Sequence, residues 1–300
     1  MKPFQRVGAL ALSFILMTTL VAGWAYAAAV PTKVAGQSGV TVYSNEKASG
    51  DASNLAEGFV TVKYTGGKQV KIKVQIYKDS NPDLKYNYNL NNAGTAETFP
   101  LTEGDGAYTI KVLENTTGDK YAQAYSCGVT LKLRSEFSPY LYSNQYVNFT
   151  SDSKVVSKAS ELVGGKSGDL DKIAAVFDYV VDNFTYDTEL AKTVQSGYLP
   201  SVDKVMESKK GICFDYAAVM SAMLRSQGIP CKLVVGWAGS TYHAWINTYI
   251  AGTGWVDKVI YFDGTNWTLM DPTFVSSGKR SDSIMKYVTT SSNYSQKYAY

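Results

Sequence analysis

The chain has 300 residues, enough for about two domains of ordinary size. Its 29 Lys and Arg nearly balance 26 Asp and Glu, and this net charge of +3 disfavours a protein that binds nucleic acid through phosphate contacts. A hydrophobic fraction of 45% excludes a disordered chain. Three cysteines cannot all pair within one chain, and a single histidine excludes a multi-histidine metal site. We therefore expect neither a disulfide scaffold nor a metal ion or other cofactor.

The N-terminus resembles a targeting segment rather than part of the fold. Two basic residues precede an uncharged stretch from Val7 to Ala22, and Ala25-Tyr26-Ala27 has the small-x-small pattern of a cleavage site. Residues 1–27 are therefore predicted to be a signal peptide, which places the protein outside the cytoplasm, secreted or at the cell surface. The alternative is an uncleaved anchor, because the apolar character continues to Val30. Only in that case do we expect contact with a membrane.

Residues 40–135 have the pattern of an antiparallel β domain. Apolar residues alternate with polar ones, most clearly from Val70 to Ile76. Gly66-Gly67 separates this run from Val60–Tyr64, which predicts a hairpin between the two runs. Further short runs at similar spacing indicate an immunoglobulin-like β-sandwich of about seven strands. The domain carries no histidine and one cysteine, Cys127, which we interpret as a small packed side chain.

After residues 136–150, which are predicted to be a linker, the period of the sequence becomes helical. Residues 151–300 are expected to form a second domain. Ser153 is positioned to cap a helix that extends through Leu162, and either Ser167 or Asp169 can cap the next one. Fold class is thus predicted as α+β, with a β-sandwich followed by a mixed domain.

A third, short helix is predicted to begin at Ser201, and a buried helix follows that begins at Cys213. Gly228-Ile229-Pro230 stops it, and its apolar positions repeat at helical spacing: Tyr216, Ala217, Met220 and Leu224. Unpaired N–H groups and the positive end of the helix dipole favour a thiolate over a thiol at such a position. Cys213 is therefore a candidate nucleophile, although cysteines at helix starts are often inert.

Strands predicted after this helix supply a candidate base and a candidate orienting group. Cys231–Trp237 and His243–Tyr249 are predicted to be strands, and a third follows at Trp267–Asp271. If the last two strands are antiparallel neighbours, they set Asp271 opposite His243. A carboxylate there would hold one imidazole nitrogen and leave the other to deprotonate a thiol, as in other nucleophile–base–orienter triads.

Other residues of this half have alternative interpretations. Cys231 opens an apolar strand and is expected to lie in the core, whereas Asp215 can cap the helix that follows Cys213. Asp257 or Asp263 can replace Asp271 as the orienting carboxylate, but both have turn-like surroundings. The Ser- and Tyr-rich end of the chain lacks a helical period, and it either packs back on the domain or stays loose.

The region from about residue 169 to 274 resembles the transglutaminase-like superfamily, circularly permuted relatives of papain-type cysteine proteases. Three matching segments carry the resemblance: Gly211–Ala217, Leu224–Pro230, and the pair Tyr242–Trp245 with Met270–Thr273. The resemblance implies a papain-like fold with Cys213 as nucleophile, His243 as base and Asp271 as orienting group. It covers none of the β-sandwich half.

The resemblance also implies that Tyr186-Asp187 lies near the cleft. The sequence departs from the family pattern in two places. Animal crosslinking members have Gln and Trp around the nucleophile, where this chain has Ile212 and Phe214. The Trp of their oxyanion hole has no assignable counterpart, so Gln195 or Tyr198 is a candidate donor beside the backbone N–H of the nucleophile. No acidic cluster with calcium-loop spacing occurs in the sequence.

Two classes of function follow. The first is a secreted cysteine enzyme that cleaves or transfers amide bonds of peptides, proteins or cell-wall peptides through a thioester at Cys213. Hydrolysis is favoured over protein crosslinking, because the aromatic walls that exclude water in the animal enzymes are incomplete here. The second is a non-catalytic surface module that binds or adapts a partner. A complete set of Cys213, His243 and Asp271 favours the first class.

Overall fold

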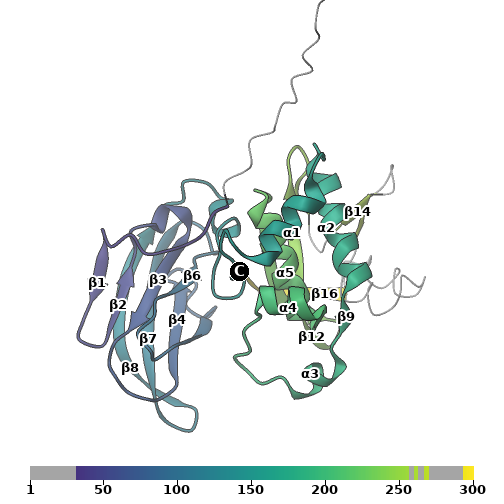
Figure 1. Cartoon of the computed structure of the whole chain (residues 1–300). Coiled ribbons are helices and arrows are strands. Elements are labelled where there is room, and N and C mark those ends of the chain that lie inside the picture. Colours follow the sequence, from purple (N-terminus) through teal and green to yellow (C-terminus); the bar gives the residue numbers. More distant parts are fainter. Residues whose placement is uncertain (1–31, 257–259, 263–266, 270–292) are drawn as a thin grey trace, which may run out of the picture.

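The computed structural model describes residues 32–256, 260–262, 267–269 and 293–300. Antiparallel β-sheets form the N-terminal part, and among these residues five helices and a further four-stranded antiparallel sheet form most of the C-terminal part (Figure 1). The α+β fold class predicted from the sequence is confirmed. Within these ranges, no helix is both long and apolar enough to cross a membrane. The predicted signal peptide lies outside the described residues.

Two four-stranded antiparallel sheets make up the β-sandwich part. The first has the order β1-β2-β3-β6: Val42–Ser44, Ala48–Asp51, Phe59–Tyr64 and Glu97–Pro100. The second has the order β5-β4-β7-β8: Tyr86–Leu90, Ile72–Lys78, Gly106–Thr117 and Lys120–Leu131. A 3-10 turn, Leu55–Glu57, precedes β3. Ile72, Val74 and Ile76 of β4 are buried while the residues between them are not, as their alternation predicted.

The predicted hairpin around Gly66-Gly67 is wrong. Strand β3 pairs with β2 and β6, whereas β4 pairs with β5 and β7, so the glycines lie in a crossover between the two sheets. The crossover is anchored by Glu114, which accepts hydrogen bonds from the Tyr64 hydroxyl (2.9 Å) and from Lys68 Nζ (2.6 Å). A Cβ at Gly66 would lie 2.5 Å from that hydroxyl. The glycine permits a close approach rather than a tight turn.

Five helices follow in chain order in the part of the chain that the structure describes. They are α1 (Lys154–Val163), α2 (Asp169–Asn183), α3 (Thr188–Thr193), α4 (Val202–Ser208) and α5 (Cys213–Ser226). Helix α1 begins after Ser153 as predicted, but the Ser153 hydroxyl accepts from Thr150 N instead of capping the helix. The N-cap of α2 is Gly168, so neither of the two predicted capping residues fills that position. The short helix α3 was not predicted from the sequence.

The sheet of the C-terminal part has the strand order β13-β12-β11-β16. Its strands are β11 (Cys231–Ala238), β12 (Thr241–Ile250), β13 (Gly254–Val256) and β16 (Tyr294–Ala299). Strands β9 (Thr185–Tyr186) and β10 (Lys210–Gly211) form a parallel pair, and β14 (Ile260–Phe262) pairs with β15 (Trp267–Leu269). The end of the chain therefore packs back on the domain as an edge strand.

Helix α5 is the centre of the C-terminal part. Every residue from Asp215 to Ser226 is buried, and the helix contacts α1, α2, α4, β11 and β12. Arg225 near its end donates to the main-chain oxygens of Cys231 (2.9 Å), Tyr142 (2.8 Å) and Tyr300 (2.5 Å). One buried guanidinium thus joins the helix to β11, to the connecting segment and to the residue after β16.

The connecting segment 136–150 is packed between the two parts. It contains the 3-10 turn Ser138–Tyr140, and Val147 and Phe149 are buried in a core continuous with both parts. Rings from the sandwich and from the end of the chain meet beside it: the centroids of Tyr86 and Tyr298 are 5.0 Å apart. The two parts are therefore joined by a buried aromatic contact and not only by the polypeptide.

Candidate active site

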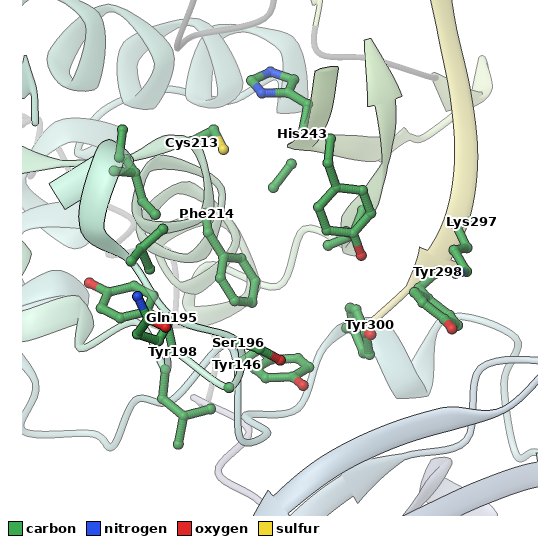
Figure 2. A pocket seen from close by; sticks show the side chains of 18 of the residues that line it. Tyr146, Gln195, Ser196, Tyr198, Cys213, Phe214, His243, Lys297, Tyr298 and Tyr300 are labelled. Atoms are coloured by element: carbon green, nitrogen blue, oxygen red, sulfur yellow. The ribbon is translucent and has the colours of Figure 1, made fainter. Parts of the chain in front are cut away.

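Cys213 and His243 line one cavity of about 830 Å³. Figure 2 shows the cysteine at the start of α5 and the histidine on β12, with aromatic side chains along the rest of the cavity. The structure thus brings two of the three predicted triad residues to the same cavity. Asp271, and the alternative carboxylates Asp257 and Asp263, lie outside the described residues.

Hydrogen bonds at the start of α5 fix the position of Cys213. Asp215 accepts from the backbone N–H of Ile212 (2.8 Å), so the predicted capping interaction is confirmed. A Cβ at Gly211 would lie 2.6 Å from the Cβ of Asp215, which explains why a glycine precedes this turn. Gly211 also pairs with Tyr186 across β10 and β9. The thiol itself is half-buried and faces the cavity, a position from which a substrate can be reached.

His243 projects from the long central strand of the sheet. It is 5% exposed and stands opposite Gly236 of β11. Its ring lies nearly parallel to that of Trp245, two residues further along the same face, with centroids 6.3 Å apart and an interplanar angle of 24°. The two rings therefore lie on the same face of the strand. Strand β15 pairs with β14 within the described residues, so the predicted pairing of the third strand with the histidine strand is not seen there.

Tyr186, Gln195 and Tyr198 also line the cavity, but they differ in their partners. The Tyr198 hydroxyl donates to Asp215 Oδ1 (2.8 Å), and Gln195 Nε2 donates to Thr193 O (2.9 Å). Both predicted oxyanion donors are thus used in local hydrogen bonds in this structure. The single proton of the Tyr198 hydroxyl is used by Asp215, whereas the Gln195 amide has a second N–H that its bond to Thr193 does not use.

Burial dominates the electrostatics of the Tyr198–Asp215 pair. Desolvation raises the pKa of the Asp215 carboxyl, and the hydrogen bonds from Ile212 N–H and from Tyr198 only partly offset it. The pKa of Tyr198 is likewise raised by burial and, to a smaller extent, by its hydrogen bond to Asp215. Asp215 accepts a hydrogen bond at the N-terminus of α5 and does not line the cavity. We therefore assign it a structural role and not that of an acid in the cavity.

The other two cysteines are poor nucleophiles. Cys231 is fully buried in the core, as expected, and burial raises the pKa of its thiol to about 11. Burial also raises the pKa of the half-buried Cys127 on β8. Neither residue lines the cavity.

Sequence reasoning missed one whole wall of the cavity. Lys73, Asn87 and Asn89 of the β-sandwich line it, together with Lys297 and Tyr300 from the end of the chain. The alternating polar face of β4 was visible in the sequence, but nothing in it indicated that this face meets a second domain. The sequence likewise did not indicate that Tyr294–Ala299 pairs with β11 and so reaches the cavity.

The aromatic lining differs from the arrangement expected of the animal enzymes. Phe214 packs against Tyr146 with ring centroids 5.2 Å apart, and Tyr146 packs against Tyr300 at 4.6 Å. The residue after the nucleophile therefore belongs to a cluster of rings that joins the helix to the connecting segment. In the described part of the chain, no three His, Cys, Asp or Glu residues come together as metal ligands.

Comparison with known proteins gives a family match for the central part of the chain. Residues 156–258 match the model of the transglutaminase-like superfamily, so this stretch is a transglutaminase-like domain. Over 189 residues the chain is 28% identical to the uncharacterised protein YebA of Bacillus subtilis; this covers 55% of the chain and 25% of YebA. The chain thus matches only about a quarter of that relative's length.

The solved structures that the chain matches include the following two. A protein from Cytophaga hutchinsonii, described as a candidate cysteine protease, is 16% identical with a TM-score of 0.41, covering 87% of this chain and 84% of that one. The periplasmic domain of TgpA from Pseudomonas aeruginosa, solved with ethylmercury bound, is 15% identical with a TM-score of 0.35, covering 76% of this chain and 74% of that one.

Proposed function

We propose that the protein is an extracytoplasmic cysteine enzyme that hydrolyses amide bonds of peptides, proteins or cell-wall peptides. The observation that carries the proposal is the shared cavity of Cys213 and His243, with the thiol at the N-terminus of a buried helix. The membership of this domain in the transglutaminase-like superfamily supports it. The predicted signal peptide supports the location.

In the proposed reaction His243 accepts the thiol proton, and the sulfur of Cys213 attacks the carbonyl carbon of the amide. The C–S bond forms while the carbonyl electron pair moves to oxygen. Collapse of this intermediate breaks the C–N bond, and His243 gives its proton to the departing amine. Water then attacks the thioester with His243 again accepting a proton, which releases the acid and restores the thiol. Asp271 is proposed to orient the imidazole.

The charge of the cavity favours water over a lysine amine as the group that resolves the thioester. Lys73 and Lys297 line the cavity, and no Asp or Glu lines it among the described residues. A protonated lysine acceptor would be repelled on approach. We therefore propose hydrolysis as the main reaction and crosslinking as a minor one.

A direct test offers the purified chain a Gln-containing peptide together with a labelled primary amine, and measures cleavage, deamidation and amine incorporation by mass spectrometry. We expect hydrolysis products with the parent protein, and none with Cys213→Ala or His243→Ala. Cys127→Ala serves as the matched control and should retain activity. Amine incorporation tenfold above hydrolysis would overturn the choice of water, and no product from a folded protein would favour the non-catalytic binding module instead.

A further inference from the structure

The β-sandwich contributes to the cavity through the exposed face of one strand pair. Lys73 of β4 and Asn89 of β5 are direct cross-strand partners, and both line the cavity with Asn87. These three residues precede Cys213 by more than a hundred positions in the sequence. The sandwich is therefore a wall of the candidate active site and not only an attached module.

Hydrogen bonds hold the Lys73 ammonium in place. Lys73 Nζ donates to Asn89 Oδ1 (2.7 Å), and Asn89 Nδ2 donates to the main-chain oxygen of Gly197 (3.2 Å). Gln145 Nε2 fixes the main chain of Asn89 with a further bond of 2.6 Å. The cation is thus positioned by both parts of the protein before any ligand binds. Partial burial and the neighbouring Lys71 lower the pKa of Lys73, as expected for a cation without a nearby carboxylate.

A second cation lies on another wall of the same cavity. Lys297 of β16 lies beside Tyr298 at the cavity (Figure 2). Its Nζ is 5.6 Å from the ring centroid of Trp237 and 5.1 Å from that of Tyr298. Neither Lys297 nor Lys73 forms an ion pair with another described residue. Glu97, a carboxylate attached to the same hydrogen-bond network, accepts from Gln145 and does not line the cavity.

We propose that Lys73 and Lys297 form a subsite for a carboxylate on the substrate, so that the enzyme selects acidic peptides as acyl donors. The inference rests on the proposed function, since it assigns the substrate class of that site. Lys73 is half-buried, and a partly desolvated ammonium binds a carboxylate more strongly than a solvated one does. Lys297 is exposed and adds a second positive charge at the cavity. The carboxylate can come from an acidic side chain or from a free C-terminus, and binding of matched peptides distinguishes these two sources.

The first test uses two small thiol reagents and needs no turnover. Iodoacetate carries a carboxylate and iodoacetamide is neutral, so the ratio of their rates at Cys213 reports the local positive field. We expect Lys73→Gln to lower this ratio by about fivefold, with a further loss in the double variant with Lys297→Gln, and 0.5 M NaCl to reduce the difference. Lys71→Gln removes the same charge beside the same strand but outside the cavity, and it should change the ratio less than about twofold.

The second test measures binding to the Cys213→Ser variant by calorimetry. Three peptides are compared: acetyl-Ala-Gln-Ala-amide, its Glu counterpart, and the Gln peptide with a free C-terminal carboxylate. We expect one of the two anionic peptides to bind about fivefold more tightly than the neutral one, and Lys73→Gln to abolish that preference. Whichever peptide gains affinity identifies the source of the carboxylate.

The outcomes separate this inference from the proposed function. If Cys213 reacts rapidly with iodoacetamide but Lys73→Gln and Lys71→Gln have equal rate ratios, the carboxylate subsite is wrong and the cysteine enzyme stands. If Cys213 is no more reactive than glutathione but the anionic peptide preference depends on Lys73, the enzyme proposal and the selection of acyl donors both fail, and only a carboxylate-binding site at Lys73 is supported. Equal binding of all three peptides contradicts the subsite in either case.

Discussion

The Tyr198 hydroxyl donates a hydrogen bond of 2.8 Å to the Asp215 carboxylate, two residues after the candidate nucleophile. The bond joins the loop before α4 to the first turn of α5. Asp215 accepts its other bond from the N–H of Ile212, so the buried carboxylate depends on two donors.

Removing one of these donors should destabilise the fold. We expect Tyr198→Phe to lower the free energy of unfolding by about 1–3 kcal/mol, because a buried acceptor loses a partner. Urea denaturation followed by circular dichroism measures the change. Tyr121→Phe is a matched control, since the Tyr121 hydroxyl makes no hydrogen bond within the described residues and its loss should cost little. Equal effects of the two substitutions would contradict the role of the Tyr198–Asp215 bond.

The buried Asp215 predicts a particular dependence of stability on pH. Its pKa is raised above 3.8 in the folded protein, chiefly by desolvation, so the folded state binds more protons than the unfolded state between 3.8 and the raised pKa. Its contribution to stability is therefore greatest below pH 3.8 and is lost as pH rises through the raised pKa. Relative to the parent, Asp215→Asn should gain stability over that window. Unfolding in urea at a series of pH values from about 3.5 to 7.5 tests this expectation.

Asp105 supplies a control of opposite sign. The N–H of Leu133 and, secondarily, Lys132 lower the pKa of this exposed carboxyl, so its contribution is present above pH 3.8 and is lost on acidification. Asp105→Asn should therefore lose stability relative to the parent as pH rises. If the stability difference from the parent changed with pH in the same direction for both variants, burial would not be the main cause of the raised pKa of Asp215.

The three thiols should differ in reactivity. We expect iodoacetamide to label Cys213 near neutral pH at least about tenfold faster than Cys127 or Cys231, because burial raises the pKa of both of the latter. Peptide mass spectrometry of briefly labelled protein gives the three rates separately. His243→Ala should slow labelling at Cys213 alone. Comparable rates at all three cysteines would remove the case for a nucleophile.

Gly236 should be intolerant of a side chain. A Cβ there would lie 2.0 Å from the main-chain oxygen of Ser295, at the bulge where β11 pairs with β16. We expect Gly236→Ala to cost about 2–4 kcal/mol, because the clash is with backbone and cannot be relieved by a rotamer change. Thermal and urea unfolding measure the loss. Gly128→Ala is the control, since the nearest atom to a Cβ at this strand glycine is 3.9 Å away.

Local patterns predicted the elements that carry the candidate chemistry. The spacing of Tyr216, Ala217, Met220 and Leu224, with a stop at Gly228–Pro230, correctly predicted α5 and the place of Cys213 at its start. The two strands after it were also correct within a few residues. Periodicity suffices for such segments because their own apolar residues face the core.

Pairing between distant segments was beyond the reach of those patterns. Alternation fixed which side of β4 is buried but not which sheet the strand joins, and the hairpin prediction at Gly66-Gly67 failed for that reason. The strand Tyr294–Ala299 was missed because its residues do not alternate between buried and exposed. Only the first and last residues are buried, and the three that follow the first are all exposed. In the sequence, Lys73 and Asn89 are ordinary polar residues on the solvent face of a sheet. Their place in the cavity depends on the packing of the second domain against that face, which local patterns do not predict.

The contact between Thr102 and the end of the chain bears on the order of folding. Thr102 Oγ1 donates to Ala299 O (2.8 Å) across 197 sequence positions, and Tyr300 packs its ring against Tyr146. Closing a loop of this length costs chain entropy, so we expect the pairing of these two segments to be slow. Lys297, Tyr298 and Tyr300 from this part of the chain line the cavity of Cys213. A chain in which the long-range contact has not yet formed therefore carries the thiol without that wall of the cavity.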